Sequence, residues 1–352
     1  ATKRPVLDIL RSAVSSVGKH MRHGALVSIE STLPPRTMQD LVIPIIEESS
    51  GMKTGRDFLL VHCPERVMPG RLLRNLKEYD RVLGGYDPPS VEAGKKLYSM
   101  IMEGKLHTSD LLHAEISKTL ENAYRDVQIA FANEVALACE ELGADAFEVR
   151  RLVNTCPFRD MHIPGAGVGG HCLPKDSWLF TSSLNEFKPT IITSARETNE
   201  HMPVHMVELV EDALSEAGRE IESSRVAILG LAFLRDSDDT RHSPALTIID
   251  RLHGRADLVV HDPYVAKGYR APLVRELEEA VNGADCLVIV TDHSCYWGLD
   301  LHNLKAEMST PVIVDGRNML SAETCRSEGF VYRGIGKGTF RGRRPWRNRA
   351  ND

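Results

Sequence analysis

A cysteine beside a glycine-rich segment is the residue of this chain best suited to nucleophilic chemistry. Cys172 follows the segment from Gly165 to Gly170, and Lys175 and Asp176 come within four residues of it. A lone cysteine is most often a small buried hydrophobic residue. Here the neighbouring glycines are flexible, and an ammonium and a carboxylate are close in sequence. Such surroundings leave a thiol partly exposed and near charged groups, which favours its reactive thiolate form. We therefore predict that Cys172 is a nucleophile and that the other six cysteines are structural.

The glycines before this cysteine match the dinucleotide pattern GxGxxG at Gly165, Gly167 and Gly170. That pattern binds a dinucleotide when a strand precedes it and a helix opens directly after it. Two prolines stand in the preceding residues and Pro174 follows soon after, so we expect neither element here. A loop whose backbone approaches a ligand is the favoured interpretation.

Polar side chains recur at helical spacing on a long amphipathic segment. Lys118 and Asn122 are four residues apart, and Arg125 continues the same face. The spacing alone is equally compatible with a solvated helix surface. The functional alternative is an ammonium and an amide directed at an oxygen that becomes negative during a reaction.

Two further polar residues stand where strands are expected to end. Glu65 follows Cys63 and Pro64 after one strand, and Thr32 follows the strand VSIES. Open α/β sheets place their ligand groups at this carboxyl edge. We therefore expect Thr32 and Glu65 to line the same edge.

A phosphate site is predicted in the C-terminal third. Ser243 and Pro244 have the residue types of an N-cap and a first helical position, and Arg235 and Arg241 are near them in sequence. A helix N-terminus with nearby arginines suits a diphosphate. Asp262 could serve as a ribose-binding acid, but the glycines that accompany one in a dinucleotide site are missing, so a nucleotide other than NAD is favoured here.

Helices and strands alternate along most of the chain, which predicts an α/β protein. The first part begins with an amphipathic helix ending near Gly24, without a strand before it, and therefore resembles an incomplete, mostly parallel sheet. Its other expected elements are a strand at 25–32, a helix at 36–50, and strands at 58–65 and 81–87.

Two long helices separate this part from a second, doubly wound region. The first is expected at 110–143, ended by Gly143, and the second at about 193–218. Strands are then predicted at 225–230, 256–262, 285–291 and 311–316. The expected fold is two Rossmann-like parallel-sheet domains, the first truncated, joined by a central long-helix domain.

Composition excludes several classes of protein. Hydrophobic residues make up 42% and charged residues 26% of the 352 residues, as in globular proteins, and no apolar run is long enough to span a bilayer. The net charge of -6 argues against nucleic-acid binding, although the basic tail after Lys337 leaves that alternative open. Seven cysteines without a CxxC pair, and no export signal, predict a reducing cytoplasm.

Taken together, the motifs resemble one enzyme family over nearly the whole chain, to about residue 336. STLPP, CPERVMPG, KxxxN, GVGGHCLPKD, GLAFLRDSDDTRHSPAL and DGRN occur in the order found in the UDP-glucose/GDP-mannose dehydrogenase family. CPERVMPG with Pro69, and GGHC with His171, look more like its UDP-N-acetyl-D-mannosamine branch than its UDP-glucose branch. Leu234 departs from the lysine usual in the family, and Arg235 can replace its charge.

The resemblance assigns roles to individual residues. Cys172 resembles the nucleophile, Lys118 the acid/base, and Asn122 and Asp176 the groups that position water and the developing oxyanion. Thr32 and Glu65 resemble the pair that hydrolyses a thioester. The residues that resemble sugar-nucleotide contacts are Arg66, Val67, Arg125, Arg159, Gly169, Phe233 and Arg317. Those that resemble NAD contacts are Ser31, Thr32, Lys175 and Arg241.

The resemblance also implies an organisation and a reaction. Residues 1–108 would be the remainder of an NAD-binding domain, 109–218 a central helical dimerisation domain carrying the cysteine loop, 219–336 a UDP-sugar-binding domain and 337–352 a basic tail. The implied partners are a UDP-sugar, NAD and a second copy of the chain, in a homodimer or higher oligomer, with no membrane or nucleic acid. The family's GxGxxG and ribose-binding acid would precede the first residue given, so we expect this chain to bind NAD weakly.

The implied reaction is the four-electron oxidation of the C6 hydroxyl of UDP-N-acetyl-D-mannosamine to a carboxylate, through a thiohemiacetal and a thioester on Cys172. UDP-glucose and UDP-N-acetylglucosamine are alternative substrates. An inactive nucleotide-sugar-binding protein is an alternative of another class, which the complete set of catalytic residue types disfavours.

Overall fold

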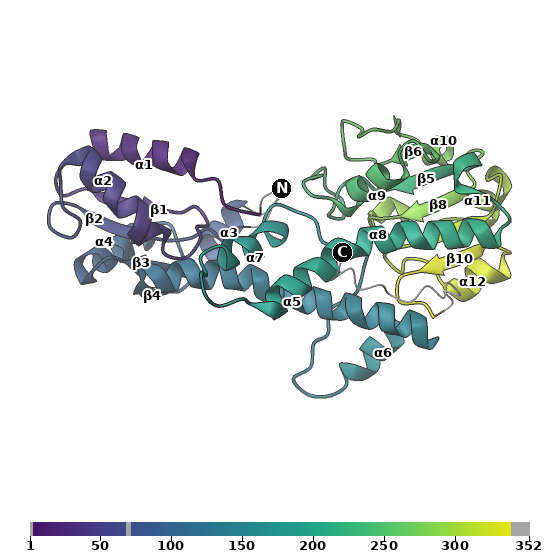
Figure 1. Ribbon diagram of the computed structural model, residues 1–352, viewed down its shortest axis with the longest axis horizontal. Helices are drawn as coiled ribbons and strands as arrows, with labels where there is room; N and C mark the ends of the chain where they lie inside the picture. The colour runs from purple at the N-terminus through teal and green to yellow at the C-terminus, as the bar shows by residue number, and fades with distance from the viewer. Residues whose placement is uncertain (1–2, 68–71, 339–352) are drawn as a thin grey trace. The chain divides into compact units, whose positions relative to one another are not determined.

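The structure, a computed structural model, describes residues 3–67 and 72–338 and contains two compact units (Figure 1). The first unit comprises the residues up to Tyr124 together with Lys175–Thr190. The second unit comprises Arg125–Pro174 and the residues from Ile191 onward. No helix among the described residues is long and apolar enough to cross a membrane.

A four-stranded sheet organises the first unit. Its strands are β1 (Leu26–Ile29), β2 (Leu59–His62), β3 (Arg81–Gly85) and β4 (Leu106–Asp110), in that order across the sheet. The β1–β2 and β3–β4 pairs are parallel, whereas β2 and β3 are antiparallel. The expectation of a mostly parallel sheet is confirmed, and the reversal places the first residue of β3 beside the ends of β1 and β2.

Helices cover both faces of this sheet (Figure 1). Leu60 of β2 packs with residues of α1 and α2, whereas its neighbour Val61 packs with Leu83 and with Tyr98 of α4. This alternation follows from the two-residue period of a strand. The helices are α1 (Asp8–His20), the π-helical turn η1 (Met38–Val42), α2 (Ile43–Ser50), α3 (Leu72–Glu78) and α4 (Pro88–Tyr98).

The helix expected at 36–50 is divided into η1 and α2. Pro44 stands in the first turn of α2, and a proline lacks the N–H that a regular α-helical turn would use. The wider turn of η1 ends at Val42, and the regular helix begins at Ile43, one residue before the proline. Gly51, with φ of +71°, then caps α2.

Long helices account for much of the middle of the chain. The helix expected at 110–143 is α5 (Leu111–Leu142), followed by Gly143 with φ of +76°. The helix expected at 193–218 is α8 (Thr190–Glu216). Two shorter helices lie between them in sequence, α6 (Ala146–Val153) and α7 (Leu173–Thr181).

The expectation that no helix follows the glycine segment is wrong, because α7 begins at Leu173. Pro174 lies in its first turn, where a missing N–H has no helical partner to lose. The expectation that no strand precedes the glycines is confirmed, since residues 154–172 contain neither helix nor strand.

A six-stranded parallel sheet organises the second unit. Its order is β10-β9-β8-β5-β6-β7, and every pair of neighbours is parallel. Read from β7, this is the doubly wound arrangement in which the strand order reverses between β5 and β8. The strands are β5 (Arg225–Leu229), β6 (Asp257–His261), β7 (Leu273–Val274), β8 (Cys286–Ile289), β9 (Val312–Asp315) and β10 (Val331–Gly334).

Both faces of this sheet are buried, which explains the continuous apolar runs of β5, β8 and β9. Val226 and Ile228 pack with α8 and with α9 (Pro244–Leu252). Ala227 and Leu229 face the other layer. That layer contains α10 (Leu277–Val281), α11 (Leu301–Glu307) and α12 (Ala322–Ser327).

Candidate active site

Two of the predicted residues lie at the carboxyl edge of the first sheet. β1 and β2 are adjacent and parallel with Ile29 opposite His62, so the segments that follow them run together. Cys63 N–H donates to the Ile29 carbonyl at 3.0 Å, and Glu65 N–H donates to the Glu30 carbonyl at 3.2 Å. The expectation that the Thr32 and Glu65 segments lie at one edge is confirmed.

A buried arginine stands between two glutamates at this edge. Arg81 begins β3, its side chain is 3% exposed, and its Nη2 lies 3.9 Å from Glu30 Oε2 and 4.0 Å from Glu65 Oε1. The Tyr98 hydroxyl donates to Glu30 Oε1 at 2.5 Å, and burial together with this bond raises the pKa of Tyr98. The Arg81 charge therefore lies between two carboxylates, and sequence reasoning did not identify it.

The predicted amide and carboxylate are in direct contact within the first unit. Asn122 Nδ2 donates to Asp176 Oδ2 at 2.5 Å, and Lys175 Nζ donates to Asp176 Oδ1 at 2.5 Å. Asp176 is fully buried, so its two oxygens are held by an amide and an ammonium rather than by water. Lys118, one helical turn before Asn122, is also buried.

A second carboxylate on α5 holds the loop that follows Thr32. Glu115 accepts hydrogen bonds from the backbone N–H groups of Arg36 at 2.9 Å and Met38 at 2.7 Å. Burial raises the pKa of Glu115 to about 7, although both hydrogen bonds oppose the rise. Glu115 is three residues from Lys118, so one stretch of α5 carries Lys118 and anchors the Thr32 loop.

The glycine loop of the second unit folds against the predicted nucleotide-sugar residues. A Cβ on Gly169 would lie 2.4 Å from Cβ of Phe233, and one on Gly165 would lie 3.2 Å from Nη1 of Arg317. Gly170 has φ of +97° and donates its N–H to the Arg241 carbonyl at 2.8 Å. Glycine is therefore required by both space and backbone conformation, and the approach of this loop to a ligand stays a prediction.

Arg317 is held at the carboxyl edge of the second sheet. Its Nε donates to the Val290 carbonyl, just after β8, at 2.7 Å. Its own N–H donates to Asp315, the last residue of β9, at 2.8 Å. Phe233 follows β5, so the two predicted substrate contacts come from strands on either side of the order reversal, where doubly wound sheets bind ligands.

Cys172 ends the glycine loop and directly precedes α7. Its side chain is half-buried, as expected for a reactive thiol. The Arg241 backbone is near this end of the loop, because its carbonyl accepts the Gly170 N–H, and its side chain forms bidentate hydrogen bonds to Asp239.

The helix N-terminus predicted to suit a diphosphate has the expected local structure. Ser243 caps α9 by accepting from the Ala245 N–H at 3.3 Å, and Pro244 is its first residue. The two nearby arginines already have carboxylate partners, because Arg235 pairs with Asp292 and Arg241 with Asp239.

Asp262 has a structural role instead of binding a ribose. One of its oxygens accepts from the N–H groups of Leu231 and Ala232, at 2.7 and 2.9 Å, and from Nε2 of His293 at 3.1 Å. The other accepts from the N–H groups of two residues in the following turn, Tyr264 and Val265. These hydrogen bonds outweigh the effect of burial and lower the pKa of Asp262. They also fix the loop that leads to Phe233.

The remaining predicted contacts are less constrained. Arg66 forms an ion pair with Glu121 at 3.0 Å. Arg125 and Arg159 are exposed, as is Ser31, and Val67 is partly exposed. Pro69 and residues 339–352 of the predicted basic tail lie outside the described residues.

The six cysteines that we predicted to be structural differ in burial. Cys63, Cys139, Cys286 and Cys325 are buried, and burial raises the pKa of each thiol. Cys156 and Cys295 are exposed. Cys156 lies in the connection after α6, and Cys295 lies in the 3-10 helix η3 (Ser294–Tyr296).

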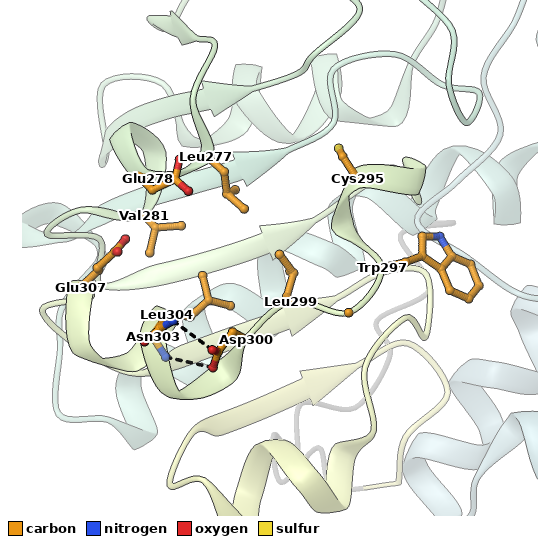
Figure 2. A pocket seen from close by; sticks show the side chains of 11 residues that line it. Leu277, Glu278, Val281, Cys295, Trp297, Leu299, Asp300, Asn303, Leu304 and Glu307 are labelled. Atoms are coloured by element: carbon orange, nitrogen blue, oxygen red, sulfur yellow. Dashed lines mark hydrogen bonds between the residues drawn. The ribbon is translucent and has the colours of Figure 1, made fainter.

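A pocket in the second unit lies away from the predicted residues. Leu277, Val281, Leu299 and Leu304 line it, between α10 and the segment leading into α11 (Figure 2). The dashed bonds in Figure 2 join Asp300 to Asn303 and are part of the N-terminal cap of α11. The pocket contains no predicted site residue.

Comparison with known proteins identifies the family. Residues 2–102, 112–201 and 227–322 match the NAD-binding, central and UDP-binding domains of the UDP-glucose/GDP-mannose dehydrogenase family. The UDP-N-acetyl-D-mannosamine dehydrogenase of Pyrococcus horikoshii is 38% identical over 335 residues, which are 95% of this chain and 78% of that protein.

Comparison with solved structures indicates the same family. The UDP-N-acetyl-D-mannosamine dehydrogenase structure from Pyrococcus horikoshii superposes with a TM-score of 0.90 at 38% identity, over 96% of this chain and 79% of that one. The structure of an NDP-N-acetyl-D-galactosaminuronic acid dehydrogenase from Methanosarcina mazei gives a TM-score of 0.89 at 39% identity, over 95% and 74%. The chain therefore belongs to the UDP-glucose/GDP-mannose dehydrogenase family, whose members are NAD-dependent nucleotide-sugar dehydrogenases.

Proposed function

We propose that this protein oxidises the C6 hydroxyl of UDP-N-acetyl-D-mannosamine to a carboxylate through covalent intermediates on Cys172. The observation that carries the proposal is the fold of the glycine loop before Cys172 against Phe233 and Arg317, at the ligand-binding edge of the second sheet. The names of the relatives at 38% and 39% identity support an acetamido sugar as the substrate class.

NAD, when bound, accepts a hydride in each of the two oxidations. We infer that NAD binds at the edge formed by the ends of β1 and β2, because open α/β sheets bind ligands at this edge. Ser31, Thr32 and Lys175 are the residues proposed to hold it in the first unit. No GxGxxG turn joins a strand to a helix among the described residues of that unit. The proposal therefore places NAD at this edge and assigns no turn of the described residues to its pyrophosphate.

The residues of α5 are proposed to control the proton and the charge on O6. Lys118, assisted by Asp176 through water, would accept the hydroxyl proton. Lys118 and Asn122 would then donate to the oxygen as it becomes negative. Asn122 is already oriented by its bond to Asp176.

Cys172 is proposed to retain the aldehyde between the two oxidations. Its thiolate adds to the aldehyde carbon, forming a C–S bond, and the oxygen takes a proton to give a thiohemiacetal. The second oxidation converts this adduct to a thioester. Water activated by Glu65, with Thr32 nearby, then adds to the thioester carbon, the C–S bond breaks, and the carboxylate and the free thiolate result.

We also propose the three-domain organisation with boundaries at 108, 218 and 336, which the three separate family matches support. Self-association through the central helices is proposed as well. Phe131 and Leu142 of α5 are exposed apolar side chains compatible with a second copy.

Thermal denaturation with a panel of sugar nucleotides tests the proposed substrate. A ligand that binds only the folded protein stabilises it by about 2.7 kcal/mol at a hundredfold excess over Kd. UDP-N-acetyl-D-mannosamine should raise Tm more than UDP-glucose or UDP-N-acetylgalactosamine. Arg317→Met should lose the shift, whereas Arg255→Met, which removes a surface ion pair with Glu211, should keep it.

Two results would contradict this function. A rise in Tm with UDP-glucose equal to that with UDP-N-acetyl-D-mannosamine would show that the protein does not prefer an acetamido sugar. If no UDP-sugar raised Tm, the proposed substrate site would be wrong. With NAD present, formation of the uronate from the best ligand tests the reaction itself.

A further inference from the structure

A buried network of four polar side chains joins α5 to α8 inside the second unit. Asp126 and Asn133 come from α5, and Arg196 and Asn199 come from α8. Each of the four is at most 1% exposed. None of them is among the residues predicted from the sequence.

The four side chains bond to one another in series. Arg196 Nη1 donates to Asp126 Oδ1 at 2.7 Å, and Asn199 Nδ2 donates to the same oxygen at 2.8 Å. Asn133 Nδ2 donates to Asn199 Oδ1 at 2.8 Å. Because each bond fixes the orientation of the next group, the network has a defined geometry that apolar packing between two helices would not provide.

The network also reaches the backbone of the loop that carries Cys172, on both sides of the cysteine. Asn133 Oδ1 accepts the Gly165 N–H at 2.9 Å. Arg196 Nη1 extends to the Leu173 carbonyl at 3.5 Å. Residues 165–172 between these points contain no helix or strand, so regular backbone hydrogen bonding does not fix their path.

We propose that Asp126, Asn133, Arg196 and Asn199 are positioning residues that fix the Cys172 loop in the orientation needed for covalent catalysis. The proposal rests on the function proposed for Cys172. It predicts that the network controls the reactivity of this thiol and not only the association of α5 with α8.

Site-resolved alkylation of the intact chain by iodoacetamide tests this prediction. Cys172 and the exposed Cys295 would be followed in one digest by mass spectrometry, with Cys295 as the internal reference. Asn133→Ala should raise the Cys172/Cys295 rate ratio by about tenfold, the equivalent of roughly 1.4 kcal/mol and the order of one buried hydrogen bond. Arg196→Lys, which keeps the charge opposite Asp126, should raise it less.

Glu140→Gln is the matched control. Glu140 is also a buried carboxylate of α5, and it bonds to His205 of α8 at 2.7 Å and to the Gly336 N–H, both of which lie outside the Cys172 loop. This variant should lower Tm and leave the rate ratio unchanged. A ratio unchanged in Asn133→Ala, or changed equally in Glu140→Gln, would overturn the proposal.

Hydrogen exchange of the unmodified chain provides a test that does not depend on the folding of variants. The Gly165 amide should exchange at the slow rate of buried α5 amides. Exchange at the rate of an unstructured peptide would overturn the proposal. Neither measurement uses a sugar nucleotide or NAD, so a failed substrate assignment would leave both results interpretable.

Discussion

The exposure of each thiol separates Cys172 from the cysteines of the two sheets. Burial raises the pKa of the Cys63 and Cys286 thiols, which keeps them protonated and unreactive. Cys172 is half-buried and ends a glycine loop. These features support a nucleophile at this position.

Cys172→Ser is expected to abolish uronate formation. A hydroxyl ionises far less than a thiol at neutral pH, so the serine would capture the aldehyde poorly and the second oxidation would not proceed. Product analysis by mass spectrometry after incubation with NAD and UDP-N-acetyl-D-mannosamine measures this. Cys295→Ser should retain the reaction, and uronate formation by Cys172→Ser at the unsubstituted rate would contradict the nucleophile assignment.

A buried histidine predicts how stability depends on pH. Burial favours neutral His205, but its bonds to Glu140 and Glu208 outweigh burial and raise its pKa to about 9, with His201 as the other titratable ring nearby. A raised pKa means that the folded state binds the proton more tightly than the unfolded chain, whose value is about 6.5. The stabilisation is therefore complete below about pH 6.5 and is lost as pH rises to about 9.

Comparison of the unsubstituted protein with His205→Gln isolates this contribution. The difference in their free energies of unfolding, measured by urea denaturation, should be largest near pH 6 and decline toward pH 9. A difference that grows over this range would show that His205 is neutral in the folded protein.

The helix α5 illustrates what sequence reasoning found and missed among side chains. Lys118 and Asn122 were identified by their spacing of four residues, and the family resemblance then assigned their roles. Glu115, Asp126 and Asn133 continue the polar positions at spacings of three, four and seven residues along the same helix. That spacing was visible, but an isolated polar residue on a helix is usually solvated, and only the packing reveals that these are buried.

Gly169→Ala is expected to disturb the loop between α6 and α7. The new Cβ would lie 2.4 Å from Cβ of Phe233, so the loop must move. Overpacking of this kind costs about 1–3 kcal/mol. We expect reduced stability in urea denaturation together with loss of the Tm shift caused by a UDP-sugar.

Gly254→Ala is the control that separates the loss of stability in Gly169→Ala from the loss of UDP-sugar binding. Gly254 has φ of +77°, and no atom lies within 4 Å of the place that a methyl group would take, so an alanine there adds backbone strain without a collision. It should lower stability and retain the UDP-sugar shift. If Gly169→Ala kept the full rise in Tm with a UDP-sugar, the loop would not be part of the substrate site.

Periodic elements could be predicted, whereas short or irregular ones could not. α5, α8 and the four central strands of the second sheet have long apolar patterns, and all lie near their expected positions. β7 and β10 were missed because β7 has two residues and β10 contains Tyr332 and Arg333 in four. The division of one expected helix into η1 and α2 depended on Pro44, which the periodicity did not reveal.

The residues of the proposed mechanism are divided between the two units. Lys118, Asn122, Glu65 and Asp176 lie in the first unit, and Cys172 lies in the second. Cys172 and Asp176 are nevertheless four residues apart in sequence, on either side of the unit boundary at Pro174. One short segment thus carries the proposed nucleophile in one unit and the proposed catalytic carboxylate in the other.

Mass spectrometry of Glu65→Gln tests the covalent mechanism most directly. This variant would be incubated with NAD and UDP-N-acetyl-D-mannosamine, quenched in acid and digested. Because acylation precedes the hydrolysis assigned to Glu65, the sugar nucleotide should accumulate as a thioester on the Cys172 peptide. An unmodified Cys172 peptide, or an adduct on another cysteine, would contradict the account.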